Sequence, residues 1–153
     1  MHELELLQSI YASSKDLDGI TIGPGDDMGE VQVGDLRILC AVDHLIVGRH
    51  VTPDTLPELI GRKAIARCLS DVAAMCAKPI GCLMTACISS DTENEWCTRV
   101  FSGAKEAAEQ WGAPIFGGDI ASCDQTKPVF TVTALATPPA SGAMLRSGAQ
   151  VGD

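Results

Sequence analysis

Aspartate residues occur at four places where an apolar segment ends or is interrupted. They lie in Gly25-Asp26-Asp27, Val42-Asp43, Ser70-Asp71 and Gly117-Gly118-Asp119. Clustered carboxylates repel one another, and a divalent cation removes that penalty. Mg²⁺ prefers a few carboxylates together with water and phosphate oxygens. The four positions therefore indicate a site for a metal ion and a nucleotide, although each aspartate taken alone is equally well explained as a turn residue or a helix cap.

The composition indicates a globular domain with a hydrophobic core. The chain has 153 residues, of which 46% are hydrophobic, 20% charged and 4% aromatic. This length and balance are typical of one folded domain. The formal net charge is −9, which disfavours binding to nucleic acid or to an anionic membrane surface. An anionic nucleotide would therefore need metal ions to neutralise it locally.

The N-terminus and the cysteines indicate a cytoplasmic protein. No apolar run approaches the ~18 residues of a transmembrane helix, and the acidic residues 1–5 lack the basic start of a signal peptide. The cysteines are odd in number and form no CxxC pair, which disfavours a zinc site and a disulfide framework. We expect them to be free and to act as small hydrophobic residues. They are Cys40, Cys68, Cys76, Cys82, Cys87, Cys97 and Cys123.

Hydrophobic periodicity and turn residues predict the order of helices and strands. Thr55 with Glu58, and Ser90 with Glu93, match the capping-box pattern of a helix start. Gly34-Asp35 is typical of a hairpin turn, and residues 22–27 are predicted to lack regular structure. The order indicates an α+β fold with helices on one face of a sheet. The predicted helices cover residues 3–13, 56–77 and 91–111, and the predicted strands cover residues 30–33, 36–47, 80–89, 114–116 and 129–136.

The common phosphate-binding sequences are absent from the chain. It contains no GxxxxGK[ST] loop and no GxGxxG sequence opening a helix after a strand. It also lacks the GxSxG sequence of a hydrolase nucleophile elbow and the catalytic loop of protein kinases. A nucleotide would therefore be held by metal-bridged carboxylates and by glycine backbone.

Several segments resemble one known family in their order and spacing. The chain is similar over nearly its whole length to the thiamine-monophosphate kinases. These belong to the aminoimidazole-ribonucleotide-synthetase superfamily, together with selenophosphate synthetase and a hydrogenase-maturation factor. The segments that carry the resemblance are residues 22–27, Asp43 with His50 seven residues later, residues 61–66, residues 69–75, residues 117–119 and residues 146–149.

The resemblance implies a magnesium–ATP site. Asp27, Asp43, Asp71 and Asp119 match the family's magnesium ligands around the ATP phosphates. Gly118 matches the backbone that approaches those phosphates. The implied cofactors are therefore Mg²⁺ and ATP, and no catalytic residue is identified.

The resemblance also implies a substrate position and a dimer. His50 matches a residue near the thiamine phosphate, and Arg146 matches a nucleotide-contacting arginine. Without the resemblance, His50 would be read as a solvated loop side chain. The family domain has a mixed, largely antiparallel sheet with helices on one face, and it dimerises into a barrel-like interface. A homodimer that binds thiamine phosphate is the resulting expectation.

The sequence departs from the family at several positions. Val42 stands where Ser or Thr usually precedes the aspartate matched by Asp43, and Ala41 stands before it. Ile120 replaces a frequent Thr, and Cys68 replaces an Asn. Each change removes a polar group that could hold a metal ion or its water. The family's C-terminal half is also expected to be missing, so that residues 1–153 form a single domain like the family's N-terminal ATP-binding domain.

Three functional alternatives remain open on these observations. The first is the ATP-binding domain of a thiamine-monophosphate kinase, inactive as an isolated chain. The second is another ATP-dependent enzyme of the superfamily that acts on a different small substrate. The third is a dimerising domain that keeps the fold and has lost catalysis, which the residues at positions 41, 42 and 120 favour.

Overall fold

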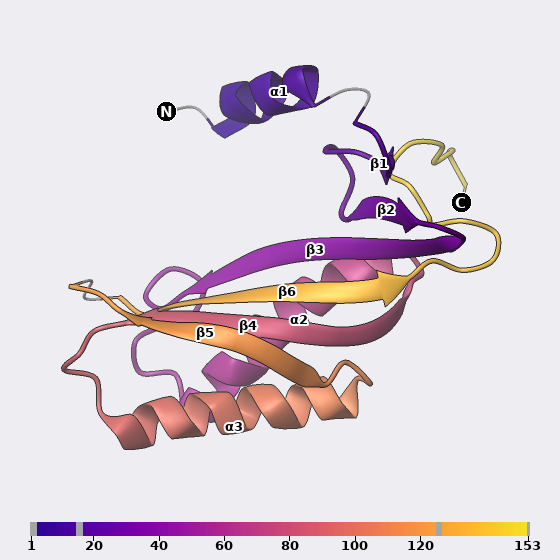
Figure 1. Cartoon of the computed structure of the whole chain (residues 1–153). Coiled ribbons are helices and arrows are strands. Elements are labelled where there is room, and N and C mark those ends of the chain that lie inside the picture. The colour runs from indigo at the N-terminus through magenta and orange to yellow at the C-terminus, as the bar shows by residue number, and fades with distance from the viewer. Residues whose placement is uncertain (1–2, 15–16, 125–126, 153) are drawn as a thin grey trace.

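A six-stranded sheet forms the centre of the molecule. The computed structural model describes residues 3–14, 17–124 and 127–152 (Figure 1). The strands lie in the order β1-β2-β3-β6-β4-β5. Four of the five strand pairings are antiparallel, and β4 with β5 is parallel. The bounds are β1 Ile20–Ile22, β2 Gly29–Val33, β3 Leu36–Ile46, β4 Lys78–Ile88, β5 Ile115–Ser122 and β6 Val129–Thr137.

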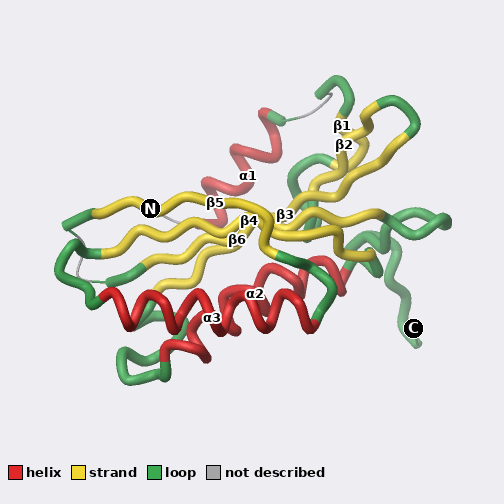
Figure 2. Tube along the Cα trace, turned by 60° about the horizontal axis from the view of Figure 1, so that its bottom comes forward, coloured by secondary structure: helices red, strands yellow, loops and turns green. Residues whose placement is uncertain are grey.

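The helices lie on both sides of this sheet. Helices α2 (Pro57–Ala74) and α3 (Asn94–Gln110) cover one face, and α1 (Glu3–Ser13) lies on the opposite side (Figures 1 and 2). In the described part of the chain, α1 makes no extensive contact with another helix or strand. The face of the sheet away from α2 and α3, which includes Val42, Leu83, Thr85 and Leu135, is called the open face below.

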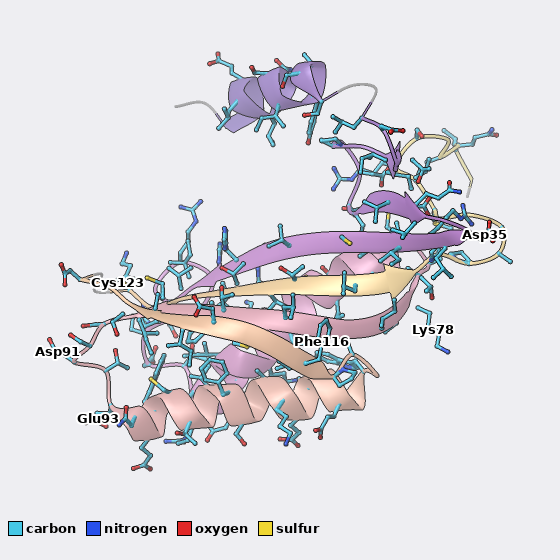
Figure 3. The ribbon with its side chains drawn as sticks, in the orientation of Figure 1. Asp35, Lys78, Asp91, Glu93, Phe116 and Cys123 are labelled. Carbon is cyan, nitrogen blue, oxygen red and sulfur yellow. The ribbon has the colours of Figure 1, made fainter. Side chains whose placement is uncertain are left out.

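The element that the sequence predicts most clearly is the hairpin formed by β2 and β3. Gly34, with φ of +60°, and Asp35 form its turn, and Val33 pairs with Leu36 (Figure 3). Glycine takes such a φ without strain. The turn therefore sets the register that carries Asp43 along β3.

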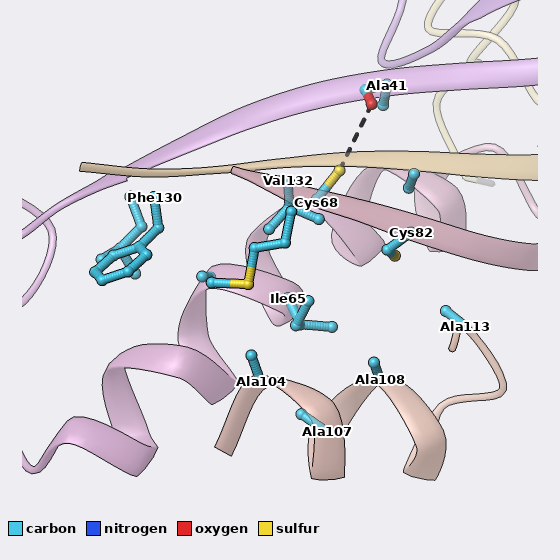
Figure 4. Packing of buried hydrophobic residues seen from close by; sticks show 14 of the residues in the cluster. Ala41, Ile65, Cys68, Cys82, Ala104, Ala107, Ala108, Ala113, Phe130 and Val132 are labelled. Atoms are coloured by element: carbon cyan, nitrogen blue, oxygen red, sulfur yellow. Dashed lines mark hydrogen bonds between the residues drawn. The ribbon is translucent and has the colours of Figure 1, made fainter. Parts of the chain in front are cut away.

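The core lies between the sheet and the helices α2 and α3. Along β6, Phe130, Val132, Ala134 and Ala136 are fully buried while the residues between them are half-buried. This alternation is the period of a strand with one face packed on helices. Ile65 and Cys68 of α2 and three alanines of α3 complete the cluster (Figure 4). Residues on α2 are thereby fixed against β3 and β6.

Two glycines let the helices α2 and α3 touch through their backbones. A Cβ at Gly61 would lie 1.9 Å from the carbonyl oxygen of Val100, and a Cβ at Gly103 would lie 2.1 Å from that of Glu58. Neither distance is possible for real atoms, so both positions require glycine. The Arg99 guanidinium also donates to Glu58 at 2.6 Å across the same helix pair.

The observed elements confirm the α+β class and correct several details. The sequence placed the helices on one face of the sheet, whereas α1 lies on the side opposite α2 and α3. The predicted strand 114–116 is too short, because β5 continues through Gly117-Gly118-Asp119 to Ser122. The three-residue strand β1 was not predicted. Helices α2 and α3 do not begin with the predicted capping boxes. The N-cap residue is Leu56 in α2 and Glu93 in α3, and no side chain forms a capping hydrogen bond in either of these two helices. Within the described residues, no helix is both long and apolar enough to cross a membrane.

Candidate functional site

Three of the predicted aspartates converge from separate segments. Asp27 precedes β2, Asp43 lies on β3 and Asp71 lies on α2. Asp43 shares the side of β3 that faces α2, because its Oδ1 accepts a hydrogen bond from Arg67 Nη2 at 2.9 Å. The backbone N–H of His44 donates to the same oxygen at 2.8 Å. The fold therefore places the Asp43 carboxylate between β3 and α2.

The electrostatics of Asp71 show that the three carboxylates interact. Partial burial raises the pKa of Asp71, and the negative charges of Asp43 and Asp27 raise it further. Ser70 and Arg146 act in the opposite direction. Mutual repulsion of this kind is what a bound cation would relieve. We refer to Asp27, Asp43 and Asp71 below as the aspartate trio.

Arginine side chains neutralise part of this charge. Arg67 pairs with Asp43, and its Nε also donates to the carbonyl oxygen of His44 at 3.1 Å. Arg146 forms an ion pair with Asp27, while its backbone N–H donates to Asp26 Oδ2 at 3.2 Å. The chain after β6 is thus held against the start of β2. The predicted nucleotide-contacting arginine therefore lies beside the trio.

Asp119 lies apart from the trio in the same chain. It pairs with Thr85 on the open face, whereas Asp43 faces α2. Paired residues lead across the sheet from Asp43 on β3 to Gly118 on β5, through Val132 on β6 and Met84 on β4. Three strand spacings therefore separate Asp43 from the residue next to Asp119, a distance on the order of 14 Å. The structure thus brings three of the four predicted metal ligands together, and it places the fourth on the other side of the sheet.

Gly118 belongs to a backbone surface at the edge of the sheet. A Cβ at this position would lie 1.8 Å from the carbonyl oxygen of Met84, so only glycine fits there. The surrounding hollow has a volume of about 490 Å³ and is lined by both glycines of Gly117-Gly118, by Asp119 and by Phe101 of α3. An exposed backbone of this kind allows close approach of a ligand.

His50 is held by its own loop close to the trio. Its Nδ1 accepts a hydrogen bond from the backbone N–H of Ile46 at 3.0 Å. The proton of the neutral ring is therefore on Nε2. Partial burial and the positive charges of Arg67 and Arg49 lower the pKa of His50, while Asp43 raises it. The lowered pKa favours the neutral form of His50, whose Nε2–H lies on the ring nitrogen that does not contact Ile46.

The trio offers the right ligand chemistry for a magnesium ion. Mg²⁺ is usually held by one or two carboxylates together with water and phosphate oxygens. Across residues 3–14, 17–124 and 127–152, no three His, Cys, Asp or Glu side chains are close enough to hold an ion among themselves. The trio therefore fits a site that phosphate and water complete, and it does not fit an all-protein cage.

Sequence reasoning did not identify Arg67 as part of this site. Arg67 and Asp71 are four residues apart on α2 and share one helix face. Because Asp71 was a predicted ligand, the same spacing could have indicated a charged neighbour. Ser70 also belongs here, since its Oγ donates to the carbonyl oxygen of Arg67 at 2.6 Å and contacts Asp71 at 3.5 Å.

The comparison with protein families gives one match that covers most of the chain. Residues 25–137 match the family model described as AIR synthase related protein, N-terminal domain. The match includes the aspartate trio, His50 and Asp119, but it ends before Arg146. It covers the sheet from β2 to β6 and both helices that pack on it.

Two curated relatives and one solved structure show how far the similarity extends. The chain is 35% identical over 134 residues to a thiamine-monophosphate kinase of Mycobacterium tuberculosis, covering 87% of this chain and 40% of the relative. It is 32% identical over 153 residues to that of Archaeoglobus fulgidus, covering 100% and 49%. A structure of AaThiL complexed with AMPPCP and TMP superposes with a TM-score of 0.83 at 28% identity, covering 99% of this chain and 46% of the other. The chain thus spans about half the length of these proteins.

Proposed function

Because the chain belongs to the AIR synthase-related family through that family's N-terminal domain, we propose that it is the ATP- and magnesium-binding part of a thiamine-monophosphate kinase. The observation that carries this proposal is the convergence of the aspartate trio from three separate segments. The AaThiL structure with AMPPCP and TMP supports the choice of substrates, since AMPPCP is an ATP analogue. The names of the curated relatives support the same reaction.

In the proposed reaction, the γ-phosphoryl group of ATP passes to the phosphate of thiamine monophosphate. Asp27, Asp43 and Asp71 would hold Mg²⁺ together with water and phosphate oxygens, and the ion would neutralise charge on those oxygens. The chain's own contribution would then be to position the two reactants, because phosphoryl transfer needs donor and acceptor in line. No side chain is required as a nucleophile in this scheme.

The arginines and His50 have defined tasks in the proposal. When a metal ion neutralises Asp43 and Asp27, the guanidinium groups of Arg67 and Arg146 become available to donate to phosphate oxygens. His50 would donate its Nε2–H to the acceptor phosphate while remaining uncharged. Gly118 would present its backbone to the nucleotide at the edge of the sheet.

We also propose that the protein forms a homodimer through its open face. Val42 is 63% exposed there, and Phe116, whose ring lies against Gly81, is 58% exposed. Helix α1, on the same side of the sheet, exposes Leu4, Leu6 and Ile10. An apolar surface of this kind marks an association site. Asp119 also lies on this face, so a dimer would bring it to the interface, and a closed, barrel-like arrangement of two sheets is the expected form.

Calorimetry on the purified chain tests the ATP-binding proposal. A non-hydrolysable ATP analogue is titrated into the protein with and without Mg²⁺. We expect Mg²⁺-dependent binding that Asp43→Asn and Asp71→Asn each weaken at least about tenfold. Asp91→Asn is the matched control, because Asp91 is an exposed carboxylate in the loop after β4 (Figure 3). Equal binding by all variants would remove the trio from the proposed site.

A non-catalytic dimerising domain is the second candidate function. Arg67 and Arg146 already neutralise two of the three carboxylates without a metal ion, and Val42 and Ile120 carry no hydroxyl group. The same calorimetry separates the two candidate functions. A non-catalytic dimerising domain would show no Mg²⁺-dependent heat with the nucleotide analogue but would still form a dimer.

A further inference from the structure

The loop after β3 is held by its own hydrogen bonds. The backbone N–H groups of Arg49 and His50 both donate to the carbonyl oxygen of Ile46, at 3.1 and 2.9 Å. The N–H of Gly48 donates to the carbonyl oxygen of Val51 at 2.8 Å. The His50 ring accepts a further bond from the N–H of Ile46 at 3.0 Å. Arg49 and His50 therefore leave the backbone at a fixed place, directly beyond the end of β3.

Helix α2 brings Lys63 towards the same loop. Residues 47–56 connect the end of β3 to the start of α2, and the helix then runs back along the strand (Figure 1). Further along the helix, Arg67 donates to the carbonyl oxygen of His44 and to the Asp43 carboxylate. Lys63 is one turn before Arg67 and shares its helix face. It therefore lies on the side of α2 that faces β3, nearer than Arg67 to the end of that strand.

The positive charges in this region have few acidic partners. Arg67 pairs with Asp43. In the part of the chain that the structure describes, neither Arg49 nor Lys63 forms an ion pair, and both are exposed. Desolvation lowers the pKa of His50, and the positive charges of these three side chains lower it further. Because the chain as a whole carries a net charge of −9, a local group of positive charges is where its surface can attract an anion.

We propose that Arg49, His50 and Lys63 form a site that binds the phosphate of a phosphate monoester without a metal ion. We refer to these residues below as the phosphate cluster. The inference rests on the proposed function, in which the monoester is thiamine monophosphate, and it assigns Arg49 and Lys63 to the acceptor. Arg67 lies between the phosphate cluster and the aspartate trio.

The side chains of the phosphate cluster suit a phosphate dianion. A guanidinium group can donate two parallel hydrogen bonds to two phosphate oxygens, and an ammonium group adds a compact positive charge. His50 adds its Nε2–H. The trio would hold the metal-bound phosphates of the nucleotide, whereas the phosphate cluster would hold a phosphate that carries no metal. A free alcohol in place of the ester offers these groups no negative charge, so the phosphate cluster would select the phosphorylated acceptor.

The spacing of Lys63 and Arg67 separates a binding role from a structural one. Like charges one turn apart on a helix destabilise it slightly. Lys63→Gln should therefore melt at the same temperature as the unsubstituted protein or slightly above it. A bound phosphate would relieve the repulsion, so phosphate should raise the melting temperature of the unsubstituted protein more than that of Lys63→Gln.

Phosphorus NMR on the full chain tests the proposal, with EDTA present so that no metal ion takes part. Inorganic phosphate and thiamine monophosphate are each titrated with the protein. We expect saturable binding of both, weakened roughly tenfold by Arg49→Gln and by Lys63→Gln. Arg62→Gln is the matched control, because Arg62 is next to Lys63 in sequence but its guanidinium donates to Gln110 and lies over the Trp111 ring. It should leave binding unchanged.

Two comparisons decide which ligand the phosphate cluster takes. Thiamine, which lacks the phosphate, should not displace inorganic phosphate. Thiamine monophosphate should bind at least as tightly as inorganic phosphate, and a site that takes only the inorganic ion would overturn the monoester proposal.

The remaining outcomes separate this inference from the proposed kinase function. No saturable binding without metal, or an equal loss on Arg62→Gln and Lys63→Gln, would overturn the phosphate cluster. Magnesium-dependent binding of the ATP analogue is measured independently, so its presence would leave the kinase proposal standing in that case. Metal-free phosphate binding without any nucleotide binding would support the phosphate cluster and count against the kinase.

Discussion

The carboxylate of Asp43 on β3 and the guanidinium of Arg67 on α2 form an ion pair at 2.9 Å. Both side chains are about one-third exposed or less. The pair joins a strand to the helix that also carries Asp71, so it couples the position of two trio members. A metal ion at Asp43 has to compete with this guanidinium.

Replacing Arg67 should therefore strengthen magnesium binding by the protein alone. For Arg67→Met we expect a several-fold lower dissociation constant for Mg²⁺ without nucleotide, because the competing cation is gone. The free energy of unfolding should fall by less than about 1 kcal/mol, since partly exposed ion pairs contribute little. Calorimetric titration with MgCl₂ measures the first effect, and urea unfolding measures the second.

The matched control is Arg99→Met. It removes an ion pair of similar type, with Glu58 at 2.6 Å, between α2 and α3. We expect no change in magnesium binding for this variant. Weaker binding by Arg67→Met than by the unsubstituted protein would show that Arg67 supports the ion and does not compete with it.

Asp71 should make the metal-free protein less stable as the pH rises. Its pKa is raised in the folded state, so the folded protein binds this proton more tightly than the unfolded chain. Stability therefore falls as the pH rises from the unfolded value of about 4 through the folded value. Without metal, Asp71→Asn should melt at a higher temperature than the unsubstituted protein at pH 7. This difference should disappear below about pH 4.

Magnesium should reverse the order of the two melting temperatures at pH 7. A ligand that binds only the folded state raises its melting temperature by mass action. We expect Mg²⁺ to stabilise the unsubstituted protein and to have little effect on Asp71→Asn. Differential scanning fluorimetry at pH 3.5–8 with and without MgCl₂ measures both trends, with the exposed Asp91→Asn as control. A pH profile of Asp71→Asn parallel to that of the unsubstituted protein would contradict the raised pKa.

Gly118 should tolerate no side chain, whereas its neighbour should tolerate a small one. Gly118→Ala would place Cβ 1.8 Å from a backbone oxygen, and β5 would have to shift. We expect a loss of roughly 1–3 kcal/mol or more in the free energy of unfolding. Gly117→Ala meets only the Leu83 Cδ2 atom at 3.0 Å, and a flexible side chain can move. Urea unfolding of both variants should therefore give a much smaller loss for Gly117→Ala.

Local signals in the sequence predicted the parts of the fold that depend on neighbours in the chain. The turn at Gly34-Asp35 and the alternation along β6 are local, and both are confirmed. Both capping boxes were wrong, and for the first one the structure shows where its two side chains bind instead. Glu58 pairs with Arg99 of α3, and Thr55 contacts Thr52 at 3.1 Å. The three residues of β1 give too short a pattern to recognise without their partner strand.

The site was predictable in its residue types but not in its arrangement. The aspartates were visible as acidic residues within or at the ends of apolar segments. Which face of a strand carries each one depends on strand register. Asp119 lies within β5 on the open face, and the strand predicted for that region ended before it. The pairing of Asp43 with Arg67 depends on how α2 packs across β3, which no local pattern encodes.

A charge on the open face should prevent dimer formation. Val42→Asp replaces an exposed apolar residue by a carboxylate, and burying that carboxylate against a second copy would be costly. We expect the unsubstituted protein to be a dimer at micromolar concentration and Val42→Asp to be a monomer with a similar melting temperature. Leu59→Asp is the control, since Leu59 is 51% exposed on α2, on the other side of the sheet. Light scattering that finds the unsubstituted protein monomeric would reject this interface.

The 153-residue chain by itself should not convert thiamine monophosphate to thiamine diphosphate. Phosphoryl transfer loses rate steeply when one reactant is loosely held, and the chain spans about half the length of the kinases it resembles. Val42 and Ile120 also lack hydroxyl groups that could complete a metal shell. We expect nucleotide binding without turnover in an assay with ATP, Mg²⁺ and thiamine monophosphate, followed by chromatography of the products. Thiamine diphosphate formed by the purified chain and abolished by Asp43→Asn would show that these residues suffice for catalysis.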